Sequence, residues 1–391
     1  SLHHLSSKRY SVFQNNICLN EEQQVIQDLA FNFAKNELLP HSHDWDEAKY
    51  FPKDVFKRAA TLGFSSIYTD SEFGGLGLGR LEASVCFEGL ATGCIPFSAY
   101  LSIHNMCAWM VDQFGSTEQK KEWIPDMVSM ERFNSYCLTE PNSGSDAAKM
   151  QTVALEKGDD FIINGTKAFV SGGGVSDNYL VMCKTGEKEI SCIKVDKECK
   201  GLSFGTPEKK MGWNLQPTSM VIMEDCVVPK RNLIGKRGEG FKIAMMGLDG
   251  GRINIGSCSL GGAAQSFNLA SDYTSHRIQF GKKISEFQHS QFKLAEMATK
   301  ISCVRILLRN AAMVIDSNSP DKTVLSAMAK YYSTQKSMEV ANDALQMHGG
   351  YGYLKDSHIE LIFRDLRVHM ILEGTNEVMK MIIAKNIIKD E

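Results

Sequence analysis

The sequence lacks any arrangement of cysteines that would bind a metal ion or form a disulfide framework. Its 11 cysteines are an odd number and are scattered from Cys18 to Cys303. They include no Cys-x-x-Cys pair and no Cys/His cluster at zinc-binding spacing. We therefore expect no metal centre, and we predict mostly buried free thiols in a protein of a reducing compartment.

Long apolar runs and long basic runs are also lacking. No apolar stretch is long enough to cross a bilayer. The formal net charge is −3, which argues against nucleic acid as the main partner. The sequence contains no P-loop, Gly-x-Ser-x-Gly or His-Glu-x-x-His motif. With 391 residues, the chain is long enough for two or three domains with sizeable cores.

Acidic residues are absent from the first twenty positions, which contain His3, His4, Lys8 and Arg9. This composition is typical of the remnant of a mitochondrial targeting segment, and an ordinary disordered terminus fits it equally well. Residues 1–19 are predicted to be a flexible N-terminus under either interpretation.

Hydrophobic periodicity divides the remainder into three parts. Residues 20–130 follow a helical period, and Asn20 with Gln23 predicts a capping box at its start. Residues 131–238 read as short β segments, and residues 239–391 as long helices that would pack as a four-helix bundle. The order, without βαβ alternation, predicts an α+β multidomain protein.

Two turns are expected in the β region. The first is Lys157-Gly158-Asp159-Asp160, which separates two apolar segments. The second is Asn164-Gly165, a type I′ hairpin signal, so Lys167–Ser171 is predicted to be the next strand. The glycine-rich run 74–79 loosely matches a dinucleotide fingerprint. It does not lie between a strand and a helix of a βαβ unit, so a surface turn is favoured.

A single carboxylate near the end of the chain is the first candidate catalytic group. Glu373 follows Met370-Ile371-Leu372 and precedes Gly374, and Thr375 can N-cap a last helix. Apolar surroundings would raise its pKa and make it a base near neutral pH. The alternative is an ordinary loop carboxylate between two helices, which local sequence alone favours.

Six separate segments, considered together, favour a catalytic Glu373 over an ordinary loop carboxylate. They are Tyr136–Asp146, Ile163–Gly173, Leu248–Arg252, Arg277–Lys282, Gln346–Gly350 and Leu372–Asn376. With these motifs in this order, the chain resembles the acyl-CoA dehydrogenases over nearly its whole length. The resemblance implies an N-terminal helical domain, a middle β-barrel domain and a C-terminal four-helix bundle, with FAD in the crevice between them. It also implies a homotetramer built as a dimer of dimers.

The resemblance implies FAD contacts at two groups of positions. Tyr136, Cys137, Leu138 and Thr139 would lie along the isoalloxazine ring, with Gly144 and Ser145 in the loop that follows. Phe169 would stack on the flavin where many relatives have tryptophan, and Ser171, after Val170, would hydrogen-bond near N5 where relatives have threonine. The pyrophosphate and adenosine contacts would come from Arg277 of a neighbouring subunit and from Phe280, Phe287, Gln288, Gln346, Gly349 and Gly350. Phe287 replaces a common histidine, which makes that contact less certain. Thr375, Asn376 and Glu377 would lie on the diphosphate–ribityl side.

The same resemblance assigns the chemistry. Ser145, Asp249, Arg252 and Gly374 match positions beside the acyl-CoA. Glu373 would remove the α-proton while the β-hydride passes to the flavin, and its own backbone N–H would bind the thioester oxygen. In the isovaleryl and long-chain members the base precedes the arginine that matches Arg252. That position is Gly251 here, so Glu373 is the only base consistent with the family.

Within the family the motifs are most similar to those of members acting on short branched acyl-CoA esters. The expected reaction converts isobutyryl-CoA to methacrylyl-CoA in valine catabolism, with electrons passed to electron transfer flavoprotein in the mitochondrial matrix. Short or 2-methyl-branched acyl-CoA substrates remain an alternative, as does a non-catalytic assembly protein. An acyl-CoA oxidase would carry a further C-terminal domain, and a nitroalkane oxidase would have aspartate in place of Glu373.

Overall fold

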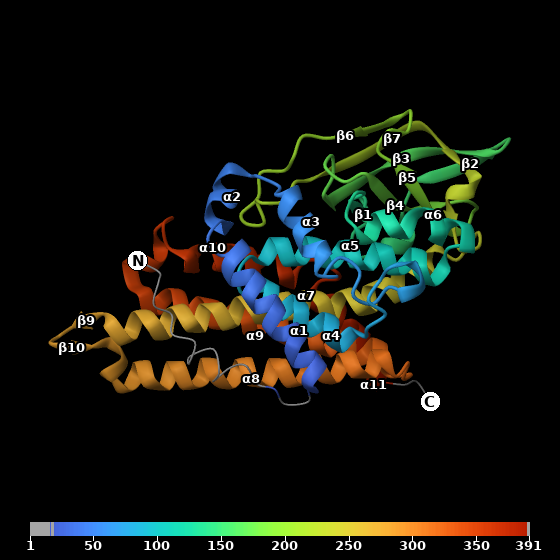
Figure 1. The fold of residues 1–391 in the computed structure, drawn as a ribbon. Helices are drawn as coiled ribbons and strands as arrows, with labels where there is room; N and C mark the ends of the chain where they lie inside the picture. The colour runs from blue at the N-terminus through green and yellow to red at the C-terminus, as the bar shows by residue number, and fades with distance from the viewer. Residues whose placement is uncertain (1–15, 17–18, 389–391) are drawn as a thin grey trace.

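The computed structural model describes residue 16 and residues 19–388. The predicted flexible terminus and targeting remnant therefore lie outside the described residues, apart from Asn16 and Leu19. Among the described residues, no helix is long and apolar enough to cross a membrane. The helical, β and helical order expected from the periodicity is confirmed (Figure 1).

Helices form the N-terminal part of the fold. Asn20 accepts from the Gln23 backbone N–H while the Gln23 side chain accepts from the Asn20 N–H, which confirms the predicted capping box. The glycine-rich run 74–79 follows a 3₁₀ turn and leads into a helix, so it is not a βαβ phosphate loop. The helices are α1 (Glu21–Phe33), α2 (Ser42–Ala48), α3 (Lys53–Thr61), α4 (Arg80–Ala91), α5 (Ile95–Phe114) and α6 (Thr117–Val128).

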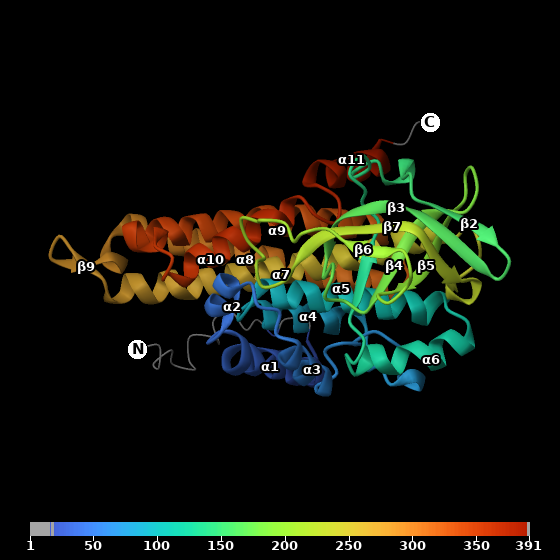
Figure 2. The same cartoon turned by 90° about the horizontal axis from the view of Figure 1, so that it is seen from above.

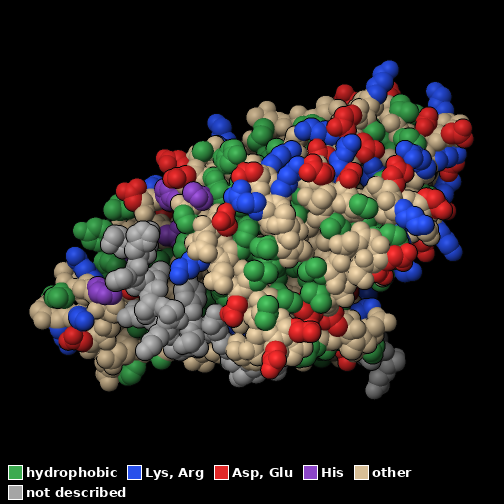
Figure 3. Space-filling model, in the orientation of Figure 1, with side chains coloured by type: hydrophobic (Ala, Val, Ile, Leu, Met, Phe, Trp, Pro, Cys, Tyr) green, Lys and Arg blue, Asp and Glu red, His purple; other side chains and the backbone are tan. Residues whose placement is uncertain are grey.

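The middle part is a mixed eight-stranded sheet. Its order is β6-β7-β3-β2-β4-β5-β8, and β1 pairs in parallel with β4. The strands are β1 (Asn134–Cys137), β2 (Val153–Lys157), β3 (Asp160–Ser171), β4 (Asn178–Lys184), β5 (Ile190–Asp196), β6 (Leu202–Phe204), β7 (Thr218–Pro229) and β8 (Leu233–Ile234). Acidic and basic side chains lie intermingled over this part of the surface (Figure 3).

The predicted hairpin at Asn164-Gly165 is wrong. These residues lie inside β3, which runs on to Ser171, and the register with β7 shifts between Ile163 and Gly165. Gly165 has φ of +150°, and a Cβ there would come within 2.4 Å of the Thr152 hydroxyl oxygen. The dipeptide therefore makes a β-bulge, because β7 is long enough to pair along all of β3. The turn at 157–160 does join β2 to β3, as expected.

Long helices form the C-terminal part. They are α7 (Gly240–His276), α8 (Gln288–Asp316), α9 (Lys322–His348), α10 (His358–Arg367) and α11 (Asn376–Ile387). α10 was not expected from the sequence. β9 (Ile278–Gln279) and β10 (Lys282–Lys283) form a small hairpin at the end of the bundle away from the sheet (Figures 1 and 2).

The centre of α7 is buried by all three parts of the chain. Residues 247–266 are buried, and α7 packs against α4, α5, α8, α9 and the strand β5. Its glycines permit this close packing: a Cβ at Gly261 would lie 2.3 Å from the Glu88 carbonyl oxygen of α4. The ten described cysteines are all free thiols, and eight of them are buried, as predicted.

Candidate functional site

Glu373 is an unpaired carboxylate at the centre of the molecule. The residue is half-buried, but its Oε2 atom is inaccessible to solvent and has no hydrogen-bond partner among the described residues. Burial raises the pKa of Glu373 to about 7, while the charges of Lys330 and Arg252 oppose the rise. The residue has φ of +55°, a strained conformation for a side chain with a Cβ. The carboxyl group can therefore exchange a proton near neutral pH.

Gly251 of α7 provides the space that the carboxylate occupies. A Cβ at Gly251 would lie 2.2 Å from Glu373 Oε2, so any larger residue there would displace the acid. Positions 251 and 373 thus meet at one point. The glycine at 251 and the glutamate at 373 are structurally complementary.

Lys330 of α9 holds the turn that carries the acid. Its Nζ donates to the Gly374 carbonyl oxygen at 2.7 Å and to Asn376 Oδ1 at 3.1 Å. Thr334 also donates to Asn376 Oδ1 at 3.2 Å. Burial lowers the pKa of Lys330 to about 8, and the charge of Glu373 opposes the decrease. The Asn376 side chain therefore anchors this turn to α9.

Asp249 and Arg252, two of the predicted CoA-side residues, lie one turn apart on α7 and contact each other. Arg252 Nη1 donates to Asp249 Oδ1 at 2.8 Å, and Thr323 donates to Asp249 Oδ2 at 2.8 Å. Arg252 Nε is buried without a partner. Ser145 and Gly144 lie on an exposed loop after β1. Asp249 and Arg252 are thus prearranged beside Glu373, while Ser145 lies at the surface.

The predicted isoalloxazine contacts lie on two neighbouring segments, residues 136–139 and 169–171, which together we call the wall. The chain after β1 runs beside β3, because Ala168 N donates to the Thr139 carbonyl oxygen at 2.8 Å. Ser135 Oγ donates to the Ser171 carbonyl oxygen at 2.6 Å. The Tyr136 hydroxyl is buried without a partner. Residues 136–139 and 169–171 are therefore brought together, as the resemblance implies.

Phe169 projects from this wall in an unusual conformation. Its φ is +55°, its side chain is 70% exposed, and the register with β7 shifts between Lys167 and Val170 at this point. An exposed aromatic ring on a strained backbone lacks a packing role within the chain. Such strain is typical of a residue that contacts a ligand.

Gln216 supports the wall through Ser171, and it belongs to none of the sequence motifs. The residue is fully buried, and its Nε2 donates to Ser171 Oγ at 3.1 Å. Its Oε1 has no partner. With the Ser171 hydroxyl accepting from Gln216, the hydroxyl hydrogen is free to point toward a ligand.

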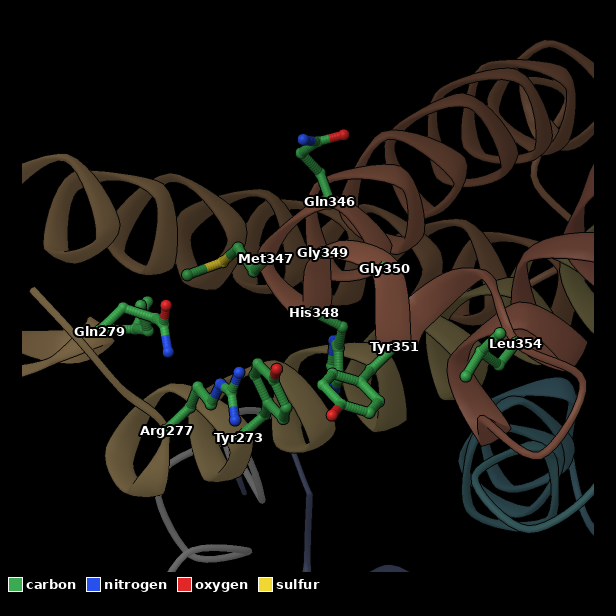
Figure 4. Close-up of a pocket in the computed structure, with 11 residues that line it drawn as sticks. Tyr273, Arg277, Gln279, Gln346, Met347, His348, Gly349, Gly350, Tyr351 and Leu354 are labelled. Atoms are coloured by element: carbon green, nitrogen blue, oxygen red, sulfur yellow. The ribbon is translucent and has the colours of Figure 1, made fainter.

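The second predicted group of cofactor residues lines a cavity at the other end of the bundle. The cavity has a volume of about 440 Å³ and includes Arg277, Gln346, Gly349 and Gly350 (Figure 4). The Arg277 guanidinium lies 5.4 Å from the centre of the Tyr351 ring. Gln288 begins α8 beside this end, and the Phe280 and Phe287 rings lie 6.4 Å apart. Phe280 is 94% exposed on the β9–β10 hairpin.

Within one chain, the two cofactor groups are therefore separate. The wall at Phe169 lies in the sheet, and the cavity at Arg277 lies at the opposite end of the long helices (Figure 1). Thr375 caps α11 by accepting from the Val378 N–H at 3.2 Å, as predicted, and Glu377 lies exposed in its first turn.

Comparison with known families matches this arrangement along the chain. The N-terminal domain model of acyl-CoA dehydrogenase matches residues 20–131, the middle domain model residues 135–226, and the C-terminal domain model residues 238–388. The chain belongs to the acyl-CoA dehydrogenase family. It is therefore an oxidoreductase of a flavoprotein family that acts on CH–CH bonds.

Individual relatives of this acyl-CoA dehydrogenase cover nearly all of it. Isobutyryl-CoA dehydrogenase, mitochondrial, of Bos taurus is 52% identical over 95% of this chain and 90% of its own. The protein of the same name from Dictyostelium discoideum is 51% identical over 95% of this chain and 91% of its own. The structure of butyryl-CoA dehydrogenase from Megasphaera elsdenii has a TM-score of 0.92 and 33% identity, covering 95% and 99% of the two chains.

Two further groups near Glu373 of this acyl-CoA dehydrogenase carry no motif signal. Arg80 is 4% exposed, its guanidinium lies 3.6 Å from the centre of the Tyr68 ring, and its Nη1 has no partner. Lys330 lies in the middle of an ordinary helical pattern. Neither a buried lysine nor a buried arginine differs in sequence from a solvated one, so only tertiary packing identifies them.

Proposed function

We propose that this chain catalyses the FAD-dependent α,β-dehydrogenation of a short branched acyl-CoA, converting isobutyryl-CoA to methacrylyl-CoA in valine catabolism. The observation that carries the proposal is the Glu373 carboxylate, which lies against Gly251 with an unpartnered Oε2 and a pKa raised to about 7. A base with a pKa near the working pH suits removal of an α-proton from a thioester.

Glu373 has two roles in this proposal. Its side chain takes the α-proton, and its backbone N–H hydrogen-bonds the thioester oxygen as negative charge develops there. Within residues 19–388, the Glu373 N–H donates to no other protein group. The bonds from Lys330 to Gly374 and Asn376 keep this turn rigid, so both groups are held in place.

The residues fit FAD in the following way. Phe169 and the 136–139 segment would hold the ring system, and Ser171, oriented by Gln216, would hydrogen-bond near N5. FAD, when bound, accepts the β-hydride. The cavity at Arg277 and Gln346 would hold the pyrophosphate and adenosine. Since these two groups are far apart in one chain, the second would serve an FAD of a partner copy in a dimer of dimers.

The substrate, electron acceptor and location rest on the relatives. Proteins named isobutyryl-CoA dehydrogenase are about half identical to this chain and are named mitochondrial. A solved structure described as the electron transferring flavoprotein of Acidaminococcus fermentans contains a chain with a TM-score of 0.93 and 38% identity. We infer a mitochondrial enzyme that passes electrons to electron transfer flavoprotein.

A substrate panel tests the proposal. Isobutyryl-, 2-methylbutyryl-, butyryl- and isovaleryl-CoA would be compared with electron transfer flavoprotein as acceptor. We expect kcat/KM to be highest for isobutyryl-CoA, and turnover of isobutyryl-CoA below that of butyryl-CoA would reject the assignment. A relative named short-chain specific acyl-CoA dehydrogenase from Rattus norvegicus is 35% identical over 97% of this chain, so short straight-chain substrates are the second candidate.

A non-catalytic role predicts a different result. Purified protein of an assembly factor would not bleach its flavin anaerobically on addition of any of the four esters. Bleaching by isobutyryl-CoA that is lost in Glu373→Gln would support the enzyme.

A further inference from the structure

Two cysteines face each other at the edge of the sheet, apart from the proposed catalytic site. In the β6–β7 pairing, Leu202 is opposite Met223 and Phe204 is opposite Val221. Beyond Gly201 the pairing is offset at Asp225, which has φ of +48°, and the Cys199 and Cys226 thiols are hydrogen-bonded to each other. Cys226 is buried within the sheet core, and Cys199 is half-buried against the same cluster.

The backbones on both sides of the pair approach closely. Glu224 N donates to the Gly201 carbonyl oxygen at 2.9 Å, and Val227 N donates to the Lys200 carbonyl oxygen at 3.2 Å. A Cβ on Gly201, which has φ of +89°, would lie 2.9 Å from Cys226 Cα. The hydrogen bond between the two thiols brings their sulfur atoms together, as disulfide formation requires.

The two thiols differ in acidity. Hydrogen bonding from the Cys226 thiol lowers the pKa of Cys199 to about 7, with help from the Asp196 backbone and Lys194, while burial and the Asp196 charge oppose it. The bond to Cys199 and burial raise the pKa of Cys226. Cys199 is thus the more acidic thiol, and it is also the member of the pair that solvent reaches.

We propose that Cys199 and Cys226 form a peroxide-responsive dithiol that closes reversibly to a disulfide between the segment before β6 and the end of β7. The Cys199 thiolate attacks a hydroperoxide, breaks its O–O bond and becomes a sulfenic acid, while the peroxide leaves as hydroxide or alkoxide. The Cys226 sulfur then attacks the sulfenic sulfur and releases water. Two thiols are oxidised and one peroxide is reduced. A dithiol reductant reverses the step.

The disulfide would close a loop that includes residues 200–225. This loop contains Gln216, which bonds Ser171, and Trp213, whose backbone N–H donates to Asp365 Oδ1 at 2.6 Å. Oxidation would therefore restrict the segment that joins the sheet to α10 and supports the 169–171 wall. The proposal concerns the thiols alone and does not depend on the acyl-CoA chemistry.

Peptide mapping of the full-length protein tests this. After treatment with hydrogen peroxide and alkylation, trypsin would release residues 198–200 linked to residues 211–230, because lysines flank both cysteines. We expect this linked pair, a mass loss of two hydrogens, a higher melting temperature, and reversal of all three by dithiothreitol. Oxidation that yields only modified Cys303, with peptides 198–200 and 211–230 unlinked, would overturn the proposal.

Two single variants separate the steps. Cys226→Ala should leave Cys199 as a sulfenic acid that dimedone labels, and Cys199→Ser should abolish both the label and the linkage. Cys303→Ser, at an exposed thiol, is the matched control and should retain the linked peptides. Linkage that persists in Cys199→Ser would also overturn the proposal, as would an absence of dimedone label in Cys226→Ala.

Discussion

Two glutamates with buried carboxylate oxygens, Glu140 and Glu373, have opposite properties. Glu140 lies after β1 and is 6% exposed. Its Oε1 accepts from Lys167 Nζ at 2.8 Å and from the Thr152 N–H at 3.0 Å, and its Oε2 accepts from the Gln151 N–H. Burial alone would raise the pKa of Glu140, but these hydrogen bonds outweigh it and lower the pKa.

Glu373 has cations nearby but no hydrogen bond to Oε2. Lys330, the positive charge that most strongly opposes the rise in the Glu373 pKa, directs its donors to Gly374 and Asn376 instead. Burial therefore raises the pKa of a carboxylate where hydrogen-bond donors are missing, and donors can outweigh it where they are present. Glu140 is held as a structural anion, whereas Glu373 remains able to take a proton. This contrast can be tested with variants of the two glutamates and of the groups around them.

The largest effect should follow from Glu373→Gln. Removing a positioned base should lower kcat by about 10²–10⁴-fold or more, while FAD content is retained. Anaerobic flavin reduction by isobutyryl-CoA in a stopped-flow instrument measures this. Glu187→Gln, at an exposed carboxylate, is the control. Reduction of Glu373→Gln at the wild-type rate would exclude Glu373 as the base.

Glu140→Gln should act on stability instead. It would leave the Lys167 ammonium buried without its counterion, at a cost of about 3–5 kcal/mol in the free energy of unfolding. Urea denaturation measures the loss. Adding Lys167→Met to this variant should recover part of it, because neither charge is then buried alone. Equal stability of wild type and Glu140→Gln would refute the claim that Glu140 is held as a structural anion.

Glu373→Gln should be more stable than the wild type at alkaline pH. The pKa of Glu373 is above the ordinary 4.5, so the folded state holds the proton more tightly and wild-type stability falls as pH rises from 4.5 to about 7. The glutamine variant escapes this loss, which is about 3 kcal/mol. Denaturation curves of both proteins at pH 5 and pH 8 test this. If the difference in their free energies of unfolding is the same at the two pH values, burial does not raise the pKa of Glu373.

Lys330→Met should move the pH profile. In the wild type, kcat/KM should rise with pH through about 7, since Glu373 must be ionised. The Lys330 charge lowers the pKa of Glu373, so its removal should shift the profile to higher pH. Lys330→Arg keeps the charge and serves as control. A shift of the profile to lower pH would mean that Lys330 raises the pKa of Glu373 and does not lower it.

The smallest effect is expected from Gln216→Leu. It removes one hydrogen bond to Ser171 Oγ, worth about 1 kcal/mol. If Ser171 contacts the flavin as proposed, the dissociation constant of FAD and the flavin midpoint potential should both change modestly. A double-mutant cycle with Ser171→Ala checks the coupling, and additive effects in that cycle would mean that Gln216 acts elsewhere.

Local patterns predicted the elements well and some of their connections poorly. The Asn20 cap, the 157–160 turn and the long helices follow from side-chain chemistry within a few residues. Asn164-Gly165 was misassigned because a positive-φ glycine serves a β-bulge as well as a hairpin turn, and here Asn164 lacks the positive φ that a type I′ turn needs. The distant strand β7 decides between them.

The sequence by itself determined the family, the order of the three parts and the identity of the candidate base, because six motifs and the glycine at 251 can be read without coordinates. Tertiary structure decided the state of that base. The missing donor at Oε2, the Lys330 ammonium held on Gly374, and the support of Ser171 by Gln216 all join segments distant in the chain. A carboxylate's pKa depends on the donors and charges around it in space, and these are set by packing.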